Sequence, residues 1–358
     1  MNVPAFGATN RVGPDAIASY SDIVDVRTPA EFDEDHVPGA INAPVLSNEE
    51  RARVGTLHAQ SSAFDARKVG AALISRNIAS LLEQWRDRPR DFAPLVYCWR
   101  GGQRSRSLAH VMNEIGWRAT QLDGGYRAYR RHVVEHLATL PAHYTYRVIC
   151  GMTGSGKSRM LSALRSEGAQ VIDLEALACH RGSLLGDLPN EPQPSQKRFE
   201  SRLLHALRQL DARSPVFVES ESRHIGRVQV PPSMLDAMRA ADCVRIDLPL
   251  DRRVALLRDE YAHFVDDPSR LAAPLAALVP LHGKAEIEQW SALAQCGDWD
   301  TFVRTLLKRH YDPAYGRAIE RNFPNFARGR VVVLGGIAEA DFRAVARPLI
   351  EQTAEQTR

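Results

Sequence analysis

The stretch best suited to chemistry is YCWRGGQRS at residues 97–105. The apolar run Leu95–Tyr97 predicts a buried strand ending at Cys98, and the two glycines that follow permit a tight turn. Such a loop directs backbone N–H groups at the Cys98 sulfur, as does the N-terminus of a helix opened by Arg104 and Ser105. These dipoles favour a thiolate, which can carry or attack a sulfur-family atom. The plain alternative is a buried structural cysteine in an ordinary turn.

Cys98 is therefore the candidate catalytic residue, because the thiolate is the nucleophilic form of cysteine. The other candidate residues of the active-site loop are Trp99, Arg100, Gly101, Gly102, Gln103, Arg104 and Ser105. Between residues 99 and 131 the chain holds seven arginines against Glu114 and Asp123. This basic zone could receive an RNA backbone, although a solvated helix face would have the same composition.

A second motif, GMTGSGKS at residues 151–158, fits the phosphate-binding pattern G-x-x-x-x-G-K-[ST] at every fixed position. The run Tyr146–Cys150 predicts a strand before it, and Arg159–Arg165 has the apolar spacing of a helix after it. In this pattern the amides approach phosphate oxygens, the lysine adds a charge and the serine can hold magnesium. A glycine-rich helix cap is the alternative. The candidate phosphate-binding residues are Gly151, Thr153, Gly154, Ser155, Gly156, Lys157 and Ser158.

Carboxylates follow two predicted strands in the same half of the chain. The run 215–219 resembles a Walker B strand with Glu219 in place of the usual Asp, and Glu221 lies just beyond it. Asp173 stands at the end of the predicted strand 171–174, where ligands gather in parallel sheets. These acids could bind magnesium through water or act as bases, or they could be solvated strand ends. The candidate anion-binding residues are His180, Arg181 and Arg223.

Alternating elements predict a parallel α/β sheet in this half. The predicted strands are 146–151, 170–174, 215–219, 243–248 and 330–335, and the predicted helices include 197–210, 233–240 and 250–263. The region 266–328 has no strand-like run and is predicted to be a helical insertion. Its aromatic residues, Trp290 among them, are expected in a core rather than on a stacking surface.

Length and composition bound the class of protein. At 358 residues the chain exceeds one usual core, so we expect two domains, 1–140 and 141–358. Apolar and charged contents of 44% and 25%, with a net charge of +3, are typical of globular proteins. Five scattered cysteines without C-x-x-C spacing argue against a metal site or a disulfide framework and suggest a reducing cytoplasm. We expect neither a membrane segment nor a signal peptide.

The first half resembles a rhodanese domain over about residues 15–137. The resemblance rests on Asp25–Phe32, His36–Asn42, the Cys98 loop and Asp123–Tyr129. In rhodaneses the loop cysteine forms a persulfide, and Cys98 matches it. Arg104 falls six residues after Cys98 rather than the usual five, which suggests a larger oxyanion than thiosulfate, such as a phosphate-bearing donor. The expected fold is thus α/β, a rhodanese-like domain followed by a P-loop NTPase-like parallel-sheet domain with a helical insertion.

Fusion of these two domains resembles the tRNA 2-selenouridine synthase family over nearly the whole chain. The further matching segments are Asp173–Glu175, His180–Ser183, Gln193–Gln196 and Val218–Arg223. The resemblance implies a transferase that geranylates the sulfur of 5-substituted 2-thiouridine at the tRNA wobble position with geranyl diphosphate. Selenophosphate then supplies selenium, and Cys98 matches the cysteine proposed to carry it as a selanyl adduct.

The resemblance also implies the partners, which are tRNA, selenophosphate and geranyl diphosphate. We expect the protein to be a monomer in the cytoplasm. No tightly bound cofactor is expected, and magnesium is possible at the P-loop. Because the geranylation step releases diphosphate, the loop 151–158 is expected to bind geranyl diphosphate rather than to drive ATP hydrolysis. The competing hypothesis is a rhodanese-type sulfurtransferase coupled to an ATP-dependent P-loop kinase.

Overall fold

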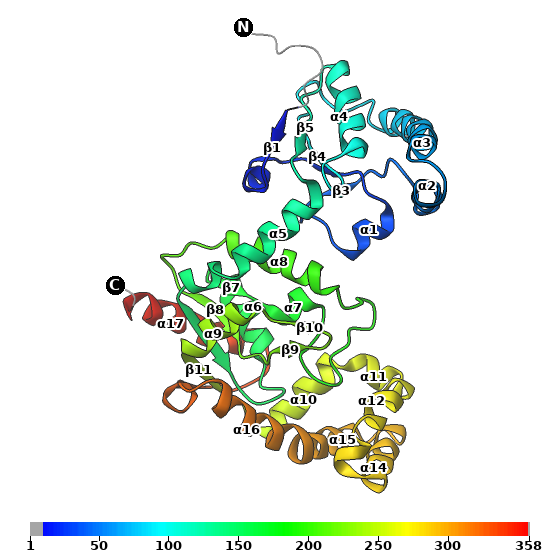
Figure 1. Cartoon of the computed structure of the whole chain (residues 1–358). Coiled ribbons are helices and arrows are strands. Elements are labelled where there is room, and N and C mark those ends of the chain that lie inside the picture. Colours follow the sequence, from blue (N-terminus) through cyan, green and yellow to red (C-terminus); the bar gives the residue numbers. More distant parts are fainter. Residues whose placement is uncertain (1–9, 357–358) are drawn as a thin grey trace. The chain divides into compact units, whose positions relative to one another are not determined.

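The structure is a computed structural model that describes residues 10–356, in two compact units. The first unit comprises the chain up to His136 together with Lys197–His205, and the second comprises Leu137–Gln196 and the chain from Ala206 onward. Figure 1 shows both units, with the ribbon coloured along the sequence from blue at the N-terminus to red at the C-terminus. A short segment from the middle of the chain therefore belongs to the first unit, apart from its neighbours in sequence.

The first unit is built on a parallel sheet of five short strands in the order β1-β5-β4-β2-β3. The strands are β1 (Arg11–Val12), β2 (Ile23–Asp25), β3 (Ile41–Asn42), β4 (Leu95–Tyr97) and β5 (Thr120–Leu122). Every residue of β2, β4 and β5 is buried, as expected for central strands covered on both faces. The predicted strand before Cys98 is therefore present, and it ends at Tyr97, one residue before the predicted end.

Helices cover this sheet and carry the rest of its core. They are α1 (Pro29–Glu34), α2 (Asn48–Gln60), α3 (Ala63–Gln84), α4 (Gln103–Ile115) and α5 (Gly125–Leu137), with a 3-10 turn, η1, at Pro14–Ser19. The helix predicted after the cysteine loop is α4, and it begins at Gln103, one residue before Arg104. Its apolar face, with Leu108 and Met112 fully buried, packs into the core of this unit.

The second unit holds another five-stranded parallel sheet, in the order β12-β11-β6-β8-β7. Its strands are β6 (Tyr146–Cys150), β7 (Gln170–Ile172), β8 (Val216–Glu219), β11 (Asp242–Asp247) and β12 (Arg330–Val333). All five predicted strands of this half are thus present. The hairpin β9 (His224–Ile225) and β10 (Val228–Gln229), outside the sheet, was not predicted.

The helices of the second unit include those that connect strands of its sheet and a helical region between β11 and β12. They are α6 (Lys157–Ser166), α7 (Leu174–Ala178), α9 (Pro232–Ala240), α10 (Leu250–Glu260), α11 (Ala262–Asp266), α12 (Ala272–Ala276), α13 (Val279–His282), α14 (Lys284–Gln295), α15 (Trp299–Leu306), α16 (Asp312–Asn322) and α17 (Glu339–Gln356). The remaining helix, α8 (Gln196–Arg208), contains the segment assigned to the first unit.

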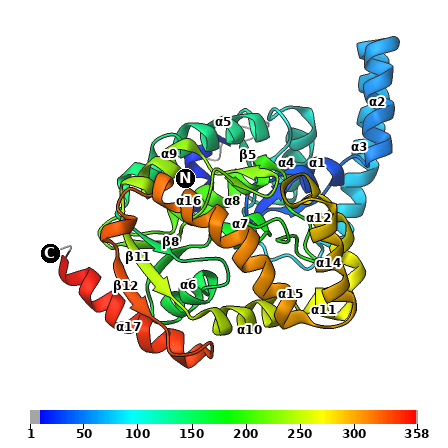
Figure 2. The same ribbon diagram turned by 90° about the horizontal axis from the view of Figure 1, so that it is seen from below.

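The helical insertion forms its own small core. α15 packs against α10 and α14, as Figure 2 shows from below. Trp290 and Trp299 are both buried in this cluster, beside Phe302. The prediction that the tryptophans serve a core rather than a stacking surface is confirmed. Among residues 10–356, no helix combines the length and the apolar character needed to cross a membrane.

A buried ion pair lies at the C-terminal end of β2 in the first unit. Arg27 and Asp25 are 1% and 0% exposed, and the Arg27 Nη2 lies 2.6 Å from the Asp25 Oδ2. Burial would lower the pKa of the guanidinium, but its hydrogen bonds and charge contact with Asp25 raise that pKa above its usual value. The guanidinium also lies 3.9 Å from the centre of the Tyr126 ring and donates to the Asp35 carbonyl at 2.6 Å.

Replacing Arg27 by alanine should leave the Asp25 carboxylate buried without its cation. We expect a loss of about 3–5 kcal/mol in the free energy of unfolding, the usual cost of breaking a buried pair. Arg11→Ala removes only the exposed ion pair with Asp123 and should cost roughly 0–1 kcal/mol. Urea denaturation of the full chain, followed by tryptophan fluorescence, measures both. Equal losses in the two variants would contradict the structural role of Arg27.

Candidate functional site

Cys98 lies at the C-terminal end of β4 and is 3% exposed. Its Sγ accepts two hydrogen bonds, one from the backbone N–H of Gly102 at 3.2 Å and one from the Ser105 hydroxyl at 3.2 Å. Donors aimed at the sulfur stabilise negative charge on it. The loop thus forms the arrangement predicted from the sequence, with the N-terminus of α4 directed at the cysteine.

The turn before α5 holds the cysteine loop in shape. The Cys98 carbonyl accepts from the Tyr126 N–H at 2.8 Å, and the Trp99 carbonyl accepts from the Arg127 N–H at 3.1 Å. Gly125 has a φ of +58°, and a Cβ at that position would lie 2.2 Å from the Cys98 carbonyl oxygen. Only glycine fits there, so Gly125 is required for the two loops to meet.

Gln121, in β5, also supports the loop. Its Nε2 donates to the carbonyl oxygens of Gly101 and Gly102 at 2.8 and 3.2 Å and contacts the Ser105 hydroxyl at 2.7 Å. The side chain is fully buried. The sequence analysis missed Gln121, and the available signal was a polar residue inside a short buried strand directly before Asp123.

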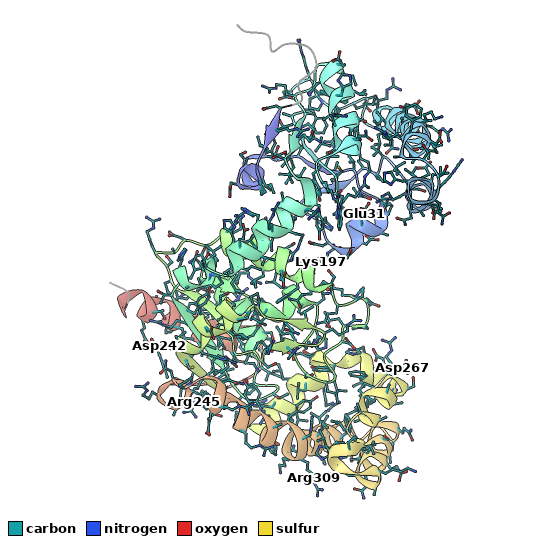
Figure 3. The ribbon with its side chains drawn as sticks, viewed as in Figure 1. Glu31, Lys197, Asp242, Arg245, Asp267 and Arg309 are labelled. Carbon is teal, nitrogen blue, oxygen red and sulfur yellow. The ribbon has the colours of Figure 1, made fainter. Side chains whose placement is uncertain are left out.

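Arg104 is paired with Glu31 of α1, which Figure 3 labels. The two Arg104 Nη atoms lie 2.8 and 3.3 Å from the Glu31 carboxylate oxygens. Burial would raise the pKa of Glu31, but the hydrogen bonds from Arg104 and from the Thr28 N–H lower it below its usual value. Arg104 thus fastens the start of α4 to α1.

The remaining loop residues differ in exposure. Trp99 is half-buried, with its ring 5.2 Å from that of Tyr126, while Arg100, Gly102 and Gln103 are exposed. Arg100 is therefore the exposed cation of the loop itself. Of the seven arginines in the basic zone, Arg104 and Arg130 are engaged in ion pairs, Arg130 with Glu200 at 2.5 Å. The exposed ones are Arg100, Arg106, Arg118, Arg127 and Arg131.

The loop 151–158 connects β6 to α6, as its motif requires. Gly156 is the N-cap of α6 with a φ of +83°, and a Cβ there would lie 2.6 Å from the Phe342 ring. The Lys157 Nζ donates to the Gly151 carbonyl at 3.2 Å and lies 5.1 Å from the centre of the Tyr315 ring. The Ser155 hydroxyl is buried and has no hydrogen-bond partner within residues 10–356. A polar atom left in this state suits an anion in the loop.

A cavity of about 550 Å³ opens beside this loop. The predicted residues that line it are Thr153, Gly154, Gly156, Lys157, Ser158, Asp173, His180, Arg181 and Glu221. Glu219 is fully buried and does not line the cavity; its Oε1 accepts from the N–H of Glu175, a lining residue, at 3.0 Å. Motifs far apart in the sequence are therefore brought to one place at the C-terminal edge of the sheet.

Carboxylates crowd one side of the cavity. A Cβ on Gly182 would lie 2.9 Å from an oxygen of Glu175 and 2.9 Å from one of Glu221, so these two side chains converge on the same point. Burial, followed by repulsion from Glu175, raises the pKa of Glu221 to about 8. Burial and the neighbouring acids likewise raise the pKa values of Glu175 and Glu219.

The residues present fit a magnesium ion. The Ser158 hydroxyl lies 3.0 Å from the Glu175 Oε2, which brings two oxygen donors together beside Lys157. The buried Glu219 Oε2 has no partner within the described part of the chain. Oxygen donors of this kind are the ligands that magnesium takes in phosphate sites. Ser158, Glu175 and Glu221 would hold the ion, and it would neutralise charge on a bound phosphate.

The other candidate residues have structural partners. Asp173 caps α7 by accepting from the Ala176 N–H at 2.8 Å, and burial raises its pKa. His180 accepts from the Gly182 N–H at 3.1 Å, and burial lowers its pKa. Arg181 donates to the Glu260 carbonyl at the cavity edge. Arg223 is exposed and does not line the cavity; its Nη2 lies 3.4 Å from the Gln229 Oε1.

Sequence reasoning missed the residues that brace the loop from the helical region. Arg253, in α10, donates to the Thr153 carbonyl at 2.9 Å and pairs with Asp312 at 2.5 Å. The Tyr315 hydroxyl contacts that of Ser220 at 2.7 Å, and its ring covers Lys157. Their signal is weak, because an arginine in a charged helix and a tyrosine 158 residues beyond the lysine form no local pattern.

The comparisons with known proteins agree with both halves of this geometry. A family model described as the tRNA 2-selenouridine synthase AAA domain matches residues 144–332, and a rhodanese-like domain model matches residues 13–132. The chain belongs to the tRNA 2-selenouridine synthase family. Both the family resemblance and the fold class predicted from the sequence are confirmed.

The relatives differ in how much of them is matched. The tRNA 2-selenouridine synthase of Nitrosomonas europaea is 38% identical over 247 residues, which cover 67% of this chain and 63% of that protein. That of Shewanella halifaxensis is 31% identical over 332 residues, covering 84% of this chain and 89% of the relative. A crystal structure of a rhodanese-related protein from Thermoplasma volcanium, 18% identical, covers 34% of this chain and 92% of its own, with a TM-score of 0.22.

The raised pKa of Glu221 predicts how magnesium affinity depends on pH. Because the folded state holds the proton up to about pH 8, the metal-free protein should lose stability as pH rises from about 4.5 to 8, while magnesium affinity increases. If one proton is released, the affinity should rise roughly tenfold per pH unit below pH 8. Calorimetric titration at several pH values measures this slope.

Two variants test the assignment of that slope. Glu221→Gln should flatten it, whereas Glu320→Gln, at an exposed position of α16, should leave it as in the wild type. An unchanged slope in Glu221→Gln would mean that another group releases the proton.

Proposed function

We propose that this protein replaces sulfur by selenium in 5-substituted 2-thiouridine at the wobble position of tRNA. Its family membership and the names of its relatives support an enzyme that acts on tRNA. The observation that carries the proposal is the pairing in one chain of two sites: a cysteine with two donors on its sulfur, and a phosphate loop beside a large cavity. Selenium exchange needs both a chalcogen site and a way to make sulfur a leaving group.

The first step is geranylation of the thiocarbonyl sulfur. The sulfur attacks the first carbon of geranyl diphosphate, the bond from that carbon to oxygen breaks, and diphosphate leaves. Negative charge develops on the leaving diphosphate, and Lys157 with the amides of its loop is suited to stabilise it. Magnesium bound by Ser158 and the carboxylates would supply further neutralisation.

The shape of the cavity supports geranyl diphosphate rather than a nucleotide as its occupant. Part of its wall is apolar, formed by Leu257 of α10, which lies against Gly154 of the phosphate loop, and by Ala318, Ile319 and Phe323 in and after α16. A branched ten-carbon chain can lie along such a wall without needing hydrogen bonds. A volume of about 550 Å³ is sufficient for the diphosphate and this chain together.

The second step is displacement of the geranylthio group. A selenium nucleophile derived from selenophosphate attacks C2 of the modified uridine, and geranylthiol departs with the electron pair of the broken carbon–sulfur bond. Selenide can carry out this exchange without a change of oxidation state. In the alternative route Cys98 carries selenium as a selanyl adduct. Its thiolate attacks the selenium of selenophosphate, the selenium–phosphorus bond breaks and phosphite leaves with its electron pair, and a thiol later reduces the sulfur–selenium bond. In both routes the donors around Cys98 hold an anionic chalcogen.

The tRNA partner fits the charge of the first unit. Arg100, Arg127 and Arg131 are among the exposed arginines in and after the cysteine loop. Cations of this kind bind phosphates of an RNA backbone and make its affinity depend on salt. Arg130, by contrast, is held by Glu200 and Ser201 and is better suited to a structural role.

A second candidate function is a sulfurtransferase coupled to an ATP-dependent P-loop kinase. It is favoured by the description of the matched family model as an AAA domain and by the carboxylates near Ser158. It differs from the first proposal in requiring nucleotide turnover. A nucleotide requirement for geranylation, or hydrolysis of ATP by the isolated protein, would favour it.

The role of Cys98 predicts a separation of the two steps. Cys98→Ser should abolish selenium insertion, because the oxygen of serine does not carry selenium. Geranylation should continue, because that step needs the diphosphate site and no thiolate. Mass spectrometry of wobble nucleosides, after incubation of thiolated tRNA with each donor, measures both products. Cys296→Ser, at an exposed cysteine, is the control and should retain both steps. Equal selenium incorporation by Cys98→Ser and wild type would remove the assigned role.

The role of Lys157 predicts the converse separation. Lys157→Ala removes the cation of the phosphate loop and should reduce the rate of geranylation of 2-thiouridine tRNA about 10²-fold or more. The variant should still convert tRNA that was geranylated beforehand, because that step uses Cys98 and selenophosphate. Full geranylation by Lys157→Ala would contradict the diphosphate assignment. Loss of both steps in a folded variant would mean that the loop also positions the tRNA.

A further inference from the structure

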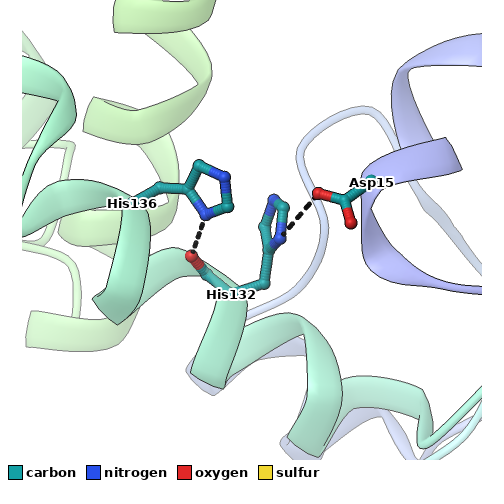
Figure 4. Close-up of side chains that lie close together, drawn as sticks. All are labelled: Asp15, His132 and His136. Atoms are coloured by element: carbon teal, nitrogen blue, oxygen red, sulfur yellow. Dashed lines mark hydrogen bonds and ion pairs between the residues drawn. The ribbon is translucent and has the colours of Figure 1, made fainter.

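A second cluster of chemically competent side chains lies in the first unit, apart from the residues assigned to the cysteine loop. It consists of Asp15 from η1 and of His132 and His136, one turn apart on α5 (Figure 4). One donor atom of each residue lies within 4.8 Å of the donor atoms of the other two. The composition is two histidines and a carboxylate, a common ligand set for transition metals.

The orientation of His136 is fixed by its helix. Its Nδ1 lies 2.8 Å from the His132 carbonyl oxygen, as the dashed line in Figure 4 marks. A carbonyl only accepts, so Nδ1 carries the proton and the lone pair of Nε2 is available on the other side of the ring. Metal-binding histidines are typically oriented in this way, by a hydrogen bond from the nitrogen that does not bind the metal.

His132 and Asp15 supply the other two ligands. The His132 Nδ1 lies 3.4 Å from the Asp15 Oδ1. Two ligands each about 2.0–2.1 Å from a tetrahedral zinc ion lie roughly 3.4 Å apart, so this pair has the separation that zinc requires. The His132 side chain is buried whereas that of Asp15 is 86% exposed. A small rotation of the exposed Asp15 can therefore complete the geometry while the buried ring stays in place.

We propose that Asp15, His132 and His136 bind one zinc ion, with water at the fourth position. The ion would join η1, which follows the edge strand β1, to the last turns of α5. The first residues of that helix, Gly125 and Tyr126, hold the Cys98 loop. Zinc would thus stabilise the helix on which the cysteine loop depends. This role is separate from the magnesium-type oxygen ligands near Ser158.

The test is a titration of the metal-free full-length chain with zinc, followed by calorimetry and by thermal unfolding. Millimolar magnesium in the buffer occupies the oxygen-rich cavity, which is a poor match for zinc. Wild type should bind zinc at this site with a raised unfolding temperature. His136→Ala and Asp15→Asn should each weaken zinc binding about tenfold or more. His110→Ala, at an exposed histidine paired with Glu114 on α4, is the matched control and should bind as wild type does.

Asp15→Asn changes an exposed side chain, so the test does not depend on a variant that fails to fold. Cobalt substitution gives an independent readout, since its absorption spectrum reports a tetrahedral site with nitrogen and oxygen ligands. Unchanged zinc affinity in both Asp15→Asn and His136→Ala would overturn the proposal. So would wild-type protein that binds no zinc.

Discussion

The backbone contact between Cys98 and the first residues of α5 is the constraint on which the rest of the first unit depends. The Tyr126 N–H reaches the Cys98 carbonyl only because Gly125 lets two loops approach without a side chain between them. With that carbonyl fixed, the chain turns through Gly101 and Gly102 so that the N-terminus of α4 faces the sulfur. Helix α5 also places the Tyr126 ring against the buried guanidinium of Arg27. The contact between Cys98 and Tyr126 therefore supports both the cysteine loop and the buried Arg27–Asp25 ion pair.

In the second unit the main constraint is the balance of charge between a buried lysine and the carboxylates around it. Burial would lower the pKa of Lys157, the cation of the phosphate loop, but charge interactions with Tyr315 and then with the three glutamates Glu175, Glu221 and Glu219 raise it. Burial and mutual repulsion raise the pKa values of the carboxylates in turn. An anionic substrate can enter a site with this many acids only if protons or a metal ion neutralise them. The site is therefore suited to an anion that binds together with a cation.

Sequence reasoning succeeded where a residue's task is local. The strand before Cys98, the two glycines after it and the motif around Lys157 each occupy a few consecutive positions, so pattern and geometry coincide. It failed where the task depends on a distant partner. Gln121 has no motif of its own, yet its amide braces the cysteine loop.

Arginines show the same limit from the other side. Seven in a short stretch predicted a surface for RNA, but charge composition does not reveal which of them have acidic partners in the fold. Arg104 pairs with Glu31, 73 residues earlier, and Arg130 pairs with Glu200, 70 residues later. Such contacts become visible only when the chain is folded, because no periodicity links positions that far apart.

The assignment of Lys197–His205 to the first compact unit has a consequence for the autonomy of that unit. Within this segment Glu200 and Ser201 contact Arg130, and the Ser201 hydroxyl donates to the buried Asp35 carboxylate at 3.1 Å. A fragment that stops at the end of α5 would lack these partners, and the Asp35 Oδ2 would lose the Ser201 donor. The rhodanese-like half is therefore not a self-contained segment of sequence. A fragment meant to contain all of this unit has to include Lys197–His205 as well.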